Sequence, residues 1–290
     1  MKKIKDSELI LNPDGSVYHL NLKPENIAND IIFVGDQDRV ESITKYFDSV
    51  EFSTQKREFK TQTGTYKDKR LTVISTGIGP DNIDIVLNEL DALVNIDFAT
   101  KTVKYNLTSL NIVRVGTSGS LQADIPVDSL LMSAFAIGTD NMLRSYSLQD
   151  ATNQSIEKAF VSHTNWDLNK GLPYVVAADN DLVKKFKSDS VFEGITVTAG
   201  GFYGAQGRVL RLKLNDELLN DKIDSFEFEG LKATNLEMET AAIYGLSKLL
   251  GHKALSLNAI VANRKNGTFS ADPYKTIDEL IRFALNKIIE

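Results

Sequence analysis

The sequence predicts an α/β fold in which helices pack on one large mixed β-sheet. Apolar runs typical of buried strands alternate with segments of helical periodicity along the chain. Several predicted strands end in glycine-containing turns, and no Pro/Gly/Ser-rich linker, internal repeat or low-complexity tract divides the sequence. With 290 residues, 42% of them hydrophobic and 25% charged, the chain can bury a full core. We therefore interpret residues 1–290 as a single domain.

The first third of the chain contains strand and helix patterns in alternation. Four consecutive apolar residues, 31–34, are typical of a strand covered on both faces. Apolar residues at helical spacing follow Asp81, which we expect to be the N-cap of that helix. We predict strands at residues 30–34, 52–63, 64–67 and 70–75, and helices at residues 38–47 and 81–94.

The rest of the chain continues the alternation. Residues 116–120 predict a glycine-containing turn that closes the strand before them. Segment 139–170 has no strong pattern, and we interpret it as a surface excursion. We predict strands at residues 110–115, 129–137, 195–199, 233–236 and 253–262, a mixed strand and helix start at 174–182, and helices at 240–251 and 273–290.

The composition excludes several classes of site. The absence of cysteine excludes disulfides, Cys-ligated zinc and thiolate nucleophiles, and three histidines without paired spacing do not predict a metal site. No Gly-x-Ser-x-Gly motif supports a serine hydrolase. The net charge is −6 with no basic run, so we expect no nucleic-acid partner. Without an apolar run of about 20 residues or a secretory signal, we expect no membrane partner and a cytoplasmic location.

Two glycine-containing segments, each with an arginine nearby, predict an anion pocket. Arg114 precedes the stretch 116–119, Gly-Thr-Ser-Gly, and Arg39 follows Gly35 after another buried strand. Glycine lets backbone N–H groups approach an anion, and the guanidinium adds a fixed charge with paired donors. Each segment alone is equally consistent with a plain turn, but two of them favour one shared pocket. Neither matches a dinucleotide or Walker motif.

Two further segments carry polar groups suited to a small ligand. Glu237-Met238-Glu239 lies where a strand meets a helix, so its carboxylates either cap the helix or bind sugar hydroxyls. An extended backbone there would point both carboxylates the same way. Residues 201–208 contain Phe202, Gln206 and Arg208, which suit a stacked ring with carbonyl and N–H groups, or form a mobile loop.

Taken in order, these pieces resemble the nucleoside phosphorylase family, and within it the uridine phosphorylase branch. Each motif is modest alone, but together they run along nearly the whole chain. The matching motifs are residues 17–20 (Val-Tyr-His-Leu), 35–40 (Gly-Asp-Gln-Asp-Arg-Val), 57–59 (Arg-Glu-Phe), 75–79 (Ser-Thr-Gly-Ile-Gly), 114–119 (Arg-Val-Gly-Thr-Ser-Gly), 202–208, 235–240 (Asn-Leu-Glu-Met-Glu-Thr) and 263–264 (Asn-Arg).

The resemblance implies α/β/α layers around a mixed, partly barrel-like sheet. It also implies a pentosyltransferase of nucleoside catabolism and pyrimidine salvage that cleaves uridine with phosphate, with deoxyuridine left open. Phosphate is then a co-substrate and no cofactor is required. Homodimers would share active sites and assemble further into hexamers.

The resemblance also implies roles for individual residues. Arg114, Gln206 and Arg208 would act in catalysis. A monovalent cation, K⁺, would lie between subunits at Glu58 and Ser75. Phosphate would be held by Gly35, Arg39, Arg114, Gly116 and Thr117, and Arg57 would reach the phosphate of the neighbouring subunit. Ribose would be held by Glu237, Met238 and Glu239, and His19 would reach the ribose of the neighbouring subunit. The base would be held by Ser118, Gly119, Phe202, Gln206 and Arg208.

Other functions remain open on the sequence alone. Purine phosphorylases and nucleosidases of the same fold are the nearest alternatives, and a catalytically inactive nucleoside sensor is a more distant one. Purine-cleaving relatives usually carry an aspartate after the late strand, where this chain has Asn263-Arg264 and no aspartate before Asp272. The chain also departs from the family at Gln37, at Gly204-Ala205 and after Gly79, where family members carry proline, Pro-Gly and a second glycine, respectively.

Overall fold

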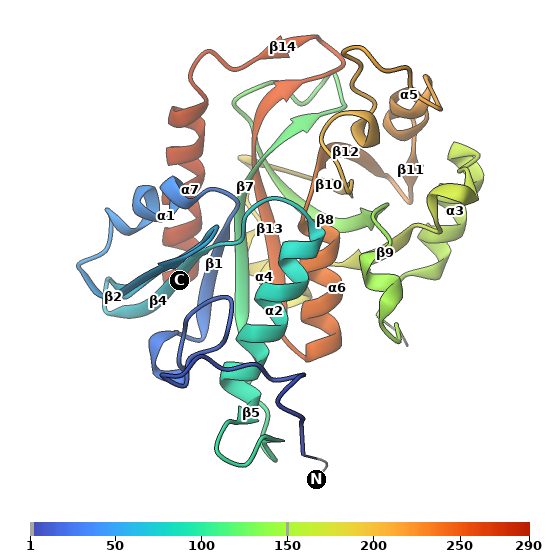
Figure 1. The fold of residues 1–290 in the computed structure, drawn as a ribbon. Helices are drawn as coiled ribbons and strands as arrows, with labels where there is room; N and C mark the ends of the chain where they lie inside the picture. The colour runs from blue at the N-terminus through green and yellow to red at the C-terminus, as the bar shows by residue number, and fades with distance from the viewer. Residues whose placement is uncertain (1–2, 149–150) are drawn as a thin grey trace.

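The computed structural model describes residues 3–148 and 151–290 and contains one large mixed sheet with helices around it (Figure 1). The strands are β1 Asp30–Val34, β2 Ser49–Lys56, β3 Phe59–Tyr66, β4 Lys69–Ser75, β5 Ile96–Asp97, β6 Thr102–Val103, β7 Asn111–Ser120, β8 Leu130–Gly138, β9 Tyr174–Ala177, β10 Val191–Thr198, β11 Glu227–Phe228, β12 Leu231–Glu237, β13 Lys253–Asn263 and β14 Thr268–Phe269. The helices are α1 Gln37–Thr44, α2 Pro80–Asn95, α3 Gln154–Thr164, α4 Asn180–Phe186, α5 Leu219–Asp224, α6 Thr240–Leu250 and α7 Pro273–Ile289.

The main sheet has 12 strands in the order β11-β12-β10-β8-β13-β7-β1-β4-β3-β2, with β9 on β8 and β14 on β13. It mixes parallel pairs, such as β1 with β7, and antiparallel pairs, such as β13 with β8. Strand β12 also pairs with β7, so β7, β13, β8, β10 and β12 form a closed ring. The predicted α/β fold with a mixed, partly barrel-like sheet is therefore confirmed.

Helices cover the sheet from two sides. In Figure 1, α1 and α7 lie on one side of β1, β7 and β13, and α2 and α6 lie on the other. Helix α6 is held by Tyr244, whose buried hydroxyl donates to the Ser133 carbonyl (2.7 Å) and accepts from the Ser256 N–H (2.8 Å). Within residues 3–148 and 151–290, no helix is long and apolar enough to cross a membrane.

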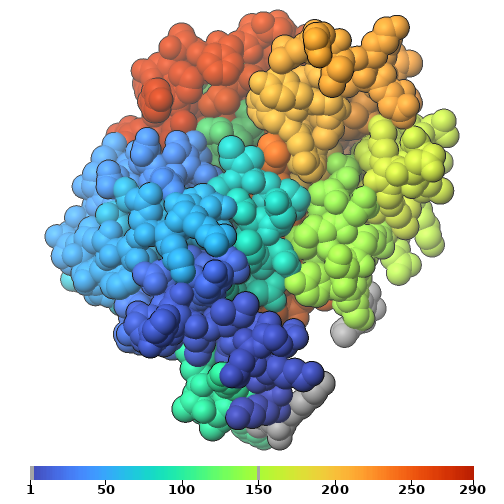
Figure 2. All heavy atoms as spheres, viewed as in Figure 1, coloured from blue at the N-terminus to red at the C-terminus, as the bar shows by residue number. Residues whose placement is uncertain are grey.

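Helix α7 near the end of the chain packs against the segment that follows α1. Figure 2 shows the C-terminal segment in red above the medium-blue segment that contains α1, whereas the dark-blue start of the chain lies at the opposite end of the view. Lys45 Nζ and the Tyr46 hydroxyl both donate to Asp278 Oδ1, at 2.7 and 2.6 Å. These contacts attach α7 to the end of α1, which starts at the edge of the predicted pocket.

The predicted strand at 52–63 is wrong, because the chain turns back within it. Strands β2 and β3 pair antiparallel with Lys56 opposite Phe59, which leaves Arg57 and Glu58 as a two-residue turn. Arg57 has a φ of 56°, in the left-handed region that such tight turns use. The alternating pattern continues in both strands, and it therefore does not mark the turn.

The predicted turn at 116–120 is also wrong. These residues continue β7, pairing with β13 as far as Ser120 and with β12 at Gly119 and Ser120. The glycines therefore do not end the strand. They lie where β7 closes the ring.

Two smaller expectations also need correction. Gly79, with a φ of 105°, is the N-cap of α2 and Pro80 occupies its first position, so Asp81 is not the cap. Segment 139–170 is not merely a surface excursion: its described part includes α3, and Ile156 and Phe160 of that helix are buried in a second core cluster.

Candidate active site

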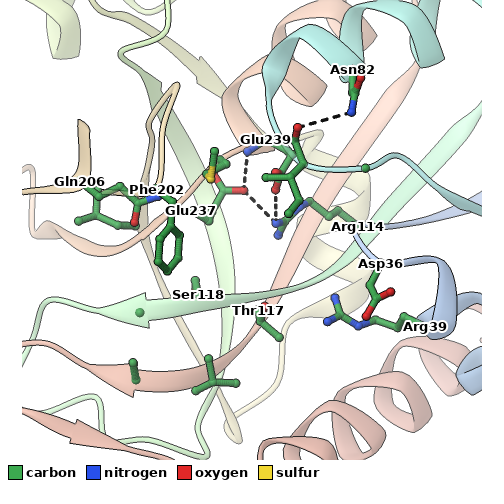
Figure 3. A pocket seen from close by; sticks show the side chains of 18 of the residues that line it. Asp36, Arg39, Asn82, Arg114, Thr117, Ser118, Phe202, Gln206, Glu237 and Glu239 are labelled. Atoms are coloured by element: carbon green, nitrogen blue, oxygen red, sulfur yellow. Dashed lines mark hydrogen bonds and ion pairs between the residues drawn. The ribbon is translucent and has the colours of Figure 1, made fainter. Parts of the chain in front are cut away.

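One cavity of about 760 Å³ brings together segments that lie far apart in the sequence. Its walls come from the loop after β1, the start of α2, strand β7, residues 202–208 and the junction of β12 with α6 (Figure 3). The predicted site residues that line it are Gly35, Arg39, Glu58, Arg114, Thr117, Ser118, Gly119, Phe202, Gln206, Arg208, Glu237, Met238 and Glu239. The sequence thus predicted most of the lining.

Arg39 and Arg114 form the cationic end of the cavity. Arg39 comes from the first turn of α1 and donates to the Val115 carbonyl (3.4 Å), and no carboxylate of the described residues lies within 4.0 Å of its guanidinium. Burial lowers the pKa of Arg39, and the charge of Arg114 lowers it further. A bound anion would offset both effects, so this end of the cavity is suited to a small anion.

Arg114 is buried and already engaged with two carboxylates. Its Nη2 lies 2.6 Å from Glu239 Oε2 and 3.1 Å from Glu237 Oε2, and its Nη1 donates to Asn258 Oδ1 at 3.0 Å. Burial acts to lower the pKa of Arg114, but the two glutamates outweigh it and raise that pKa. Nη1 also lies 3.5 Å from the Ser256 hydroxyl, so of the five N–H donors only Nε–H has no partner among the described residues.

Gly116 makes room for the Arg114 side chain. A Cβ at this position would lie 1.9 Å from Arg114 Nη1 and 2.4 Å from its Cζ. Gly116 does not line the cavity, so its predicted role in phosphate binding is indirect. Because it has no side chain, the guanidinium can lie flat against the strand.

Replacing Gly116 by alanine is expected to displace Arg114 and to lower the melting temperature by several degrees, about the effect of 1–3 kcal/mol of overpacking. Gly119→Ala is the matched control on the same strand, because a Cβ there would meet no atom closer than 3.7 Å. Thermal unfolding of both variants checks this. Equal melting temperatures for the two would contradict the assignment.

The two glutamates lie between the cationic end and the opposite wall (Figure 3). Glu237 caps α6: its carboxylate accepts from the N–H groups of Glu239 (2.9 Å) and Thr240 (3.0 and 3.1 Å). Glu239 Oε1 accepts from the Gly79 N–H (2.9 Å). Burial and the neighbouring Glu237 raise the pKa of Glu239. Capping and ligand binding are therefore compatible here, and both carboxylates converge on Arg114 as the alternation predicts.

The opposite wall carries the aromatic, amide and guanidinium groups. The Arg208 guanidinium carbon lies 3.9 Å from the centre of the Phe202 ring, and Nη1 donates to Gln206 Oε1 (2.5 Å) and to the Phe202 carbonyl (2.7 Å). The Gln206 oxygen is thus occupied, and its NH₂ group remains as a donor. Burial lowers the pKa of Arg208.

Arg264, which the family motif includes but to which we assigned no role, supports this wall. Its Nη1 donates to the Gln206 carbonyl at 2.5 Å. Burial, with a smaller contribution from Arg208, lowers the pKa of Arg264 to about 10. Two guanidinium groups therefore lie at this end as well, and they favour a ligand that gains negative charge.

Some predicted residues lie outside the cavity of their own chain. The His19 side chain is 27% exposed and its Nδ1 lies 2.6 Å from Glu89 Oε1. Arg57 is exposed at the β2–β3 turn, with its guanidinium carbon 6.0 Å from the centre of the Tyr18 ring. Both are on the surface, where a neighbouring subunit could be reached, and their roles toward a neighbour stay predictions.

Glu58 and Ser75, the predicted cation ligands, lie next to each other. Glu58 lines the cavity, but Ser75 is fully buried. The Ser75 hydroxyl donates to the Glu58 carbonyl (2.6 Å) and accepts from the Lys60 N–H (2.7 Å). In the described part of the chain, no group of three or more His, Asp or Glu side chains is placed to hold a metal ion. The role of Glu58 and Ser75 toward a monovalent cation between subunits stays a prediction.

Sequence reasoning missed several lining residues. Asn82 and Phe269 carried no signal, because an amide in a helix and an exposed aromatic in a two-residue strand are common. Asp36 could have been inferred, since it precedes α1 and its side chain accepts from the Asp38 N–H as an N-cap. The remaining lining residues that we did not predict are Gln37, Asp38, Gly77, Ile78, Leu236, Val261 and Ala262.

The fold is that of the phosphorylases. A sequence model of the Phosphorylase superfamily matches residues 30–286, and the chain belongs to this superfamily. A solved relative is the nucleoside phosphorylase of Trypanosoma brucei, described as showing uridine phosphorylase activity: it is 32% identical with a TM-score of 0.87, and the match covers 97% of this chain and 99% of that one. The family membership predicted from the motifs is confirmed.

Curated relatives include enzymes for both kinds of base. A uridine phosphorylase of Thermococcus kodakarensis is 27% identical over 269 residues, which cover 93% of this chain and 85% of the relative. A DeoD-type purine nucleoside phosphorylase of Listeria welshimeri is 26% identical over 275 residues, covering 94% of this chain and 99% of the relative. Sequence identity alone does not separate the two activities.

Proposed function

We propose that this protein is a uridine phosphorylase, a pentosyltransferase that converts uridine and phosphate to uracil and ribose 1-phosphate. The observation that carries the proposal is the order of groups along the cavity in Figure 3. Arg39 and Arg114 lie at one end, Glu237 and Glu239 in the middle, and the wall with Phe202 and Gln206 at the other. This order matches phosphate, ribose and base.

In the proposed reaction, phosphate attacks C1′ of ribose as the bond to the base nitrogen breaks. The electron pair of that bond leaves with the base, and the sugar passes through an oxocarbenium-like state. Arg39 and the Nε–H of Arg114 would hold the phosphate dianion in line with C1′. Arginines position this charge without removing it, so the dianion still stabilises the cationic sugar.

The sugar lies between the two carboxylates in this proposal. Glu239 would accept hydrogen bonds from ribose hydroxyls through the carboxylate that Arg114 and the Gly79 N–H already orient. Met238 lines the cavity between the glutamates and would contact the sugar. Deoxyuridine would lose one of these hydrogen bonds, and we propose it as a weaker substrate.

Negative charge that gathers on the departing uracil would be stabilised at the opposite wall. The NH₂ group of Gln206 and the remaining donors of Arg208 are suited to carbonyl oxygens, and Phe202 offers a face for stacking. Because the donors are held in place before reaction, they need little reorganisation. No covalent enzyme intermediate is required.

Purine cleavage is the second candidate, because curated relatives include purine nucleoside phosphorylases. At the position where purine-cleaving members usually carry an acid, this chain has Asn263. Its side-chain NH₂ donates to the carbonyls of Gln122 and Ile125, both at 2.8 Å. A buried amide in this role cannot protonate a purine nitrogen, which favours the pyrimidine.

The wider biological context is also part of the proposal. We propose a cytoplasmic homo-oligomer, a dimer with shared sites or a hexamer built from dimers, in which His19 and Arg57 complete the neighbouring site. The exposure of both residues supports this arrangement. A role in pyrimidine salvage follows from the proposed reaction.

Incubation with uridine is expected to release uracil only when phosphate is present, with ribose 1-phosphate formed in equal amount. Uracil and inosine-derived hypoxanthine, measured by chromatography with and without phosphate, check this. Release without phosphate would indicate a nucleosidase, and release from inosine alone a purine phosphorylase. Binding without release would indicate a sensor.

A further inference from the structure

A ring of buried polar side chains runs through the inside of the strand barrel. Each of the five strands that close the barrel contributes at least one member, and none is more than 6% exposed. The members of this polar ring are Arg114 and Ser118 of β7, Asn258 of β13, Ser133 of β8, Thr196 of β10 and Asn235 of β12.

The direction of the hydrogen bonds is fixed at Arg114. A guanidinium only donates, so the Asn258 atom at 3.0 Å from Arg114 Nη1 must be the amide oxygen. The Asn258 NH₂ group then faces Ser133 and donates to its hydroxyl oxygen at 3.3 Å. The hydrogen of the Ser133 hydroxyl must therefore go elsewhere.

From Ser133, the hydrogen bonds continue through Thr196 and Asn235 to Ser118. Within the described chain, the only acceptor for the Ser133 hydroxyl is Thr196 Oγ1, at 2.5 Å. Thr196 in turn donates to Asn235 Oδ1 at 2.8 Å. The Asn235 NH₂ group then donates to Ser118 Oγ at 2.9 Å. Every donor in the ring points the same way round.

Ser118 is where the ring meets the cavity. Its oxygen accepts from Asn235, and no acceptor among the described residues takes its own hydrogen. Ser118 lines the cavity, and Figure 3 places it between Thr117 and the Phe202 ring. The Ser118 hydroxyl is therefore left to donate into the cavity, on the side of the proposed base.

We propose that Asn235 is a positioning residue that fixes the Ser118 hydroxyl as a hydrogen-bond donor to a carbonyl oxygen of the pyrimidine base. The inference rests on the proposed function. A hydroxyl held in this direction needs little reorientation when the base binds. It also weakens the binding of any ligand that presents an N–H or O–H group at the same point, because two donors would then face each other.

The test is a double-mutant cycle on uridine binding, measured by titration calorimetry without phosphate. In the otherwise unaltered protein, Ser118→Ala should weaken binding about tenfold, the effect of one lost hydrogen bond, and Ser118→Thr should retain affinity. With Asn235→Asp at about pH 9, where a carboxylate is ionised even if burial raises its pKa by about four units, the Ser118 hydroxyl would donate to residue 235 instead. Adding Ser118→Ala should then change affinity less than about twofold.

The outcomes separate the inference from the proposed function. A tenfold effect of Ser118→Ala with and without Asn235→Asp would overturn the inference alone, as would no effect in either background. Failure of the unaltered protein to bind uridine would overturn the proposed function as well. If Asn235→Asp does not fold, Asn235→Leu is used in its place. Without Asn235, the Ser118 hydroxyl is free to occupy about three rotamers. The loss of uridine affinity caused by Ser118→Ala should then be about threefold smaller. An undiminished effect would count against the ring.

Discussion

Replacing Arg114 by alanine is expected to abolish phosphorolysis and to destabilise the protein by about 3–5 kcal/mol. The second effect follows from the contacts of Arg114 with Glu237 and Glu239 at 3.1 and 2.6 Å. Without the guanidinium, two buried carboxylates face each other with no cation between them. Turnover should fall at least about 1000-fold, because the same residue would hold phosphate and orient Glu239.

The two effects of this substitution can be separated. Urea unfolding measures the stability, and uracil release at saturating phosphate measures turnover. Combining Arg114→Ala with Glu239→Gln removes one of the stranded charges and should recover part of the stability without recovering turnover. A single variant with unaltered unfolding free energy would show that Arg114 is not the counter-ion of the glutamates.

Arg39→Ala is expected to act on phosphate and not on stability. Losing charge-assisted hydrogen bonds to the dianion should lower kcat/KM for phosphate about 100-fold. Arg39 makes no ion pair within the described chain, and its charge opposes that of Arg114, so its loss should leave the melting temperature unchanged or higher.

Kinetics with phosphate as the varied substrate, together with thermal unfolding, test the Arg39 prediction. Arg282→Ala is the control for charge removal, because Arg282 is exposed on α7 and its only ion pair among the described residues is with Asp278, at 3.2 Å. If Arg39→Ala raised the KM for uridine and left the KM for phosphate unaltered, the cationic end of the cavity would have been assigned to the wrong substrate.

The sequence predicted the framework and most of the cavity because both depend on local patterns. Apolar runs of the length of β1 and β4 identify buried strands directly. The alternation of Glu237, Met238 and Glu239 placed both carboxylates on one side, and both contact Arg114. Glycines next to arginines indicated the cationic end of the cavity. We expected these glycines to bring backbone N–H groups to an anion, whereas Gly116 makes room for the Arg114 side chain.

What the sequence did not predict depends on contacts between distant residues. Gly116 faces the Arg114 side chain inside a strand, and a glycine in a strand looks like a turn until its partner strands are known. Asn258 lies 144 residues from Arg114, so its role as a partner cannot be read from spacing. Asn235 was marked only as part of the family motif at 235–240, and its contacts with Thr196 and Ser118 also join distant residues.

The cavity is built from two kinds of backbone. Arg114, Thr117 and Ser118 belong to strands that form a closed ring without a free edge, whereas Phe202, Gln206 and Arg208 lie in a segment with only a short 3₁₀ helix, Gly204–Gln206. Insertions or exchanges in that segment leave the strand ring intact. Over evolutionary time, such a protein can change which base it accepts while its phosphate chemistry stays the same, so the choice of base is the more readily evolved property.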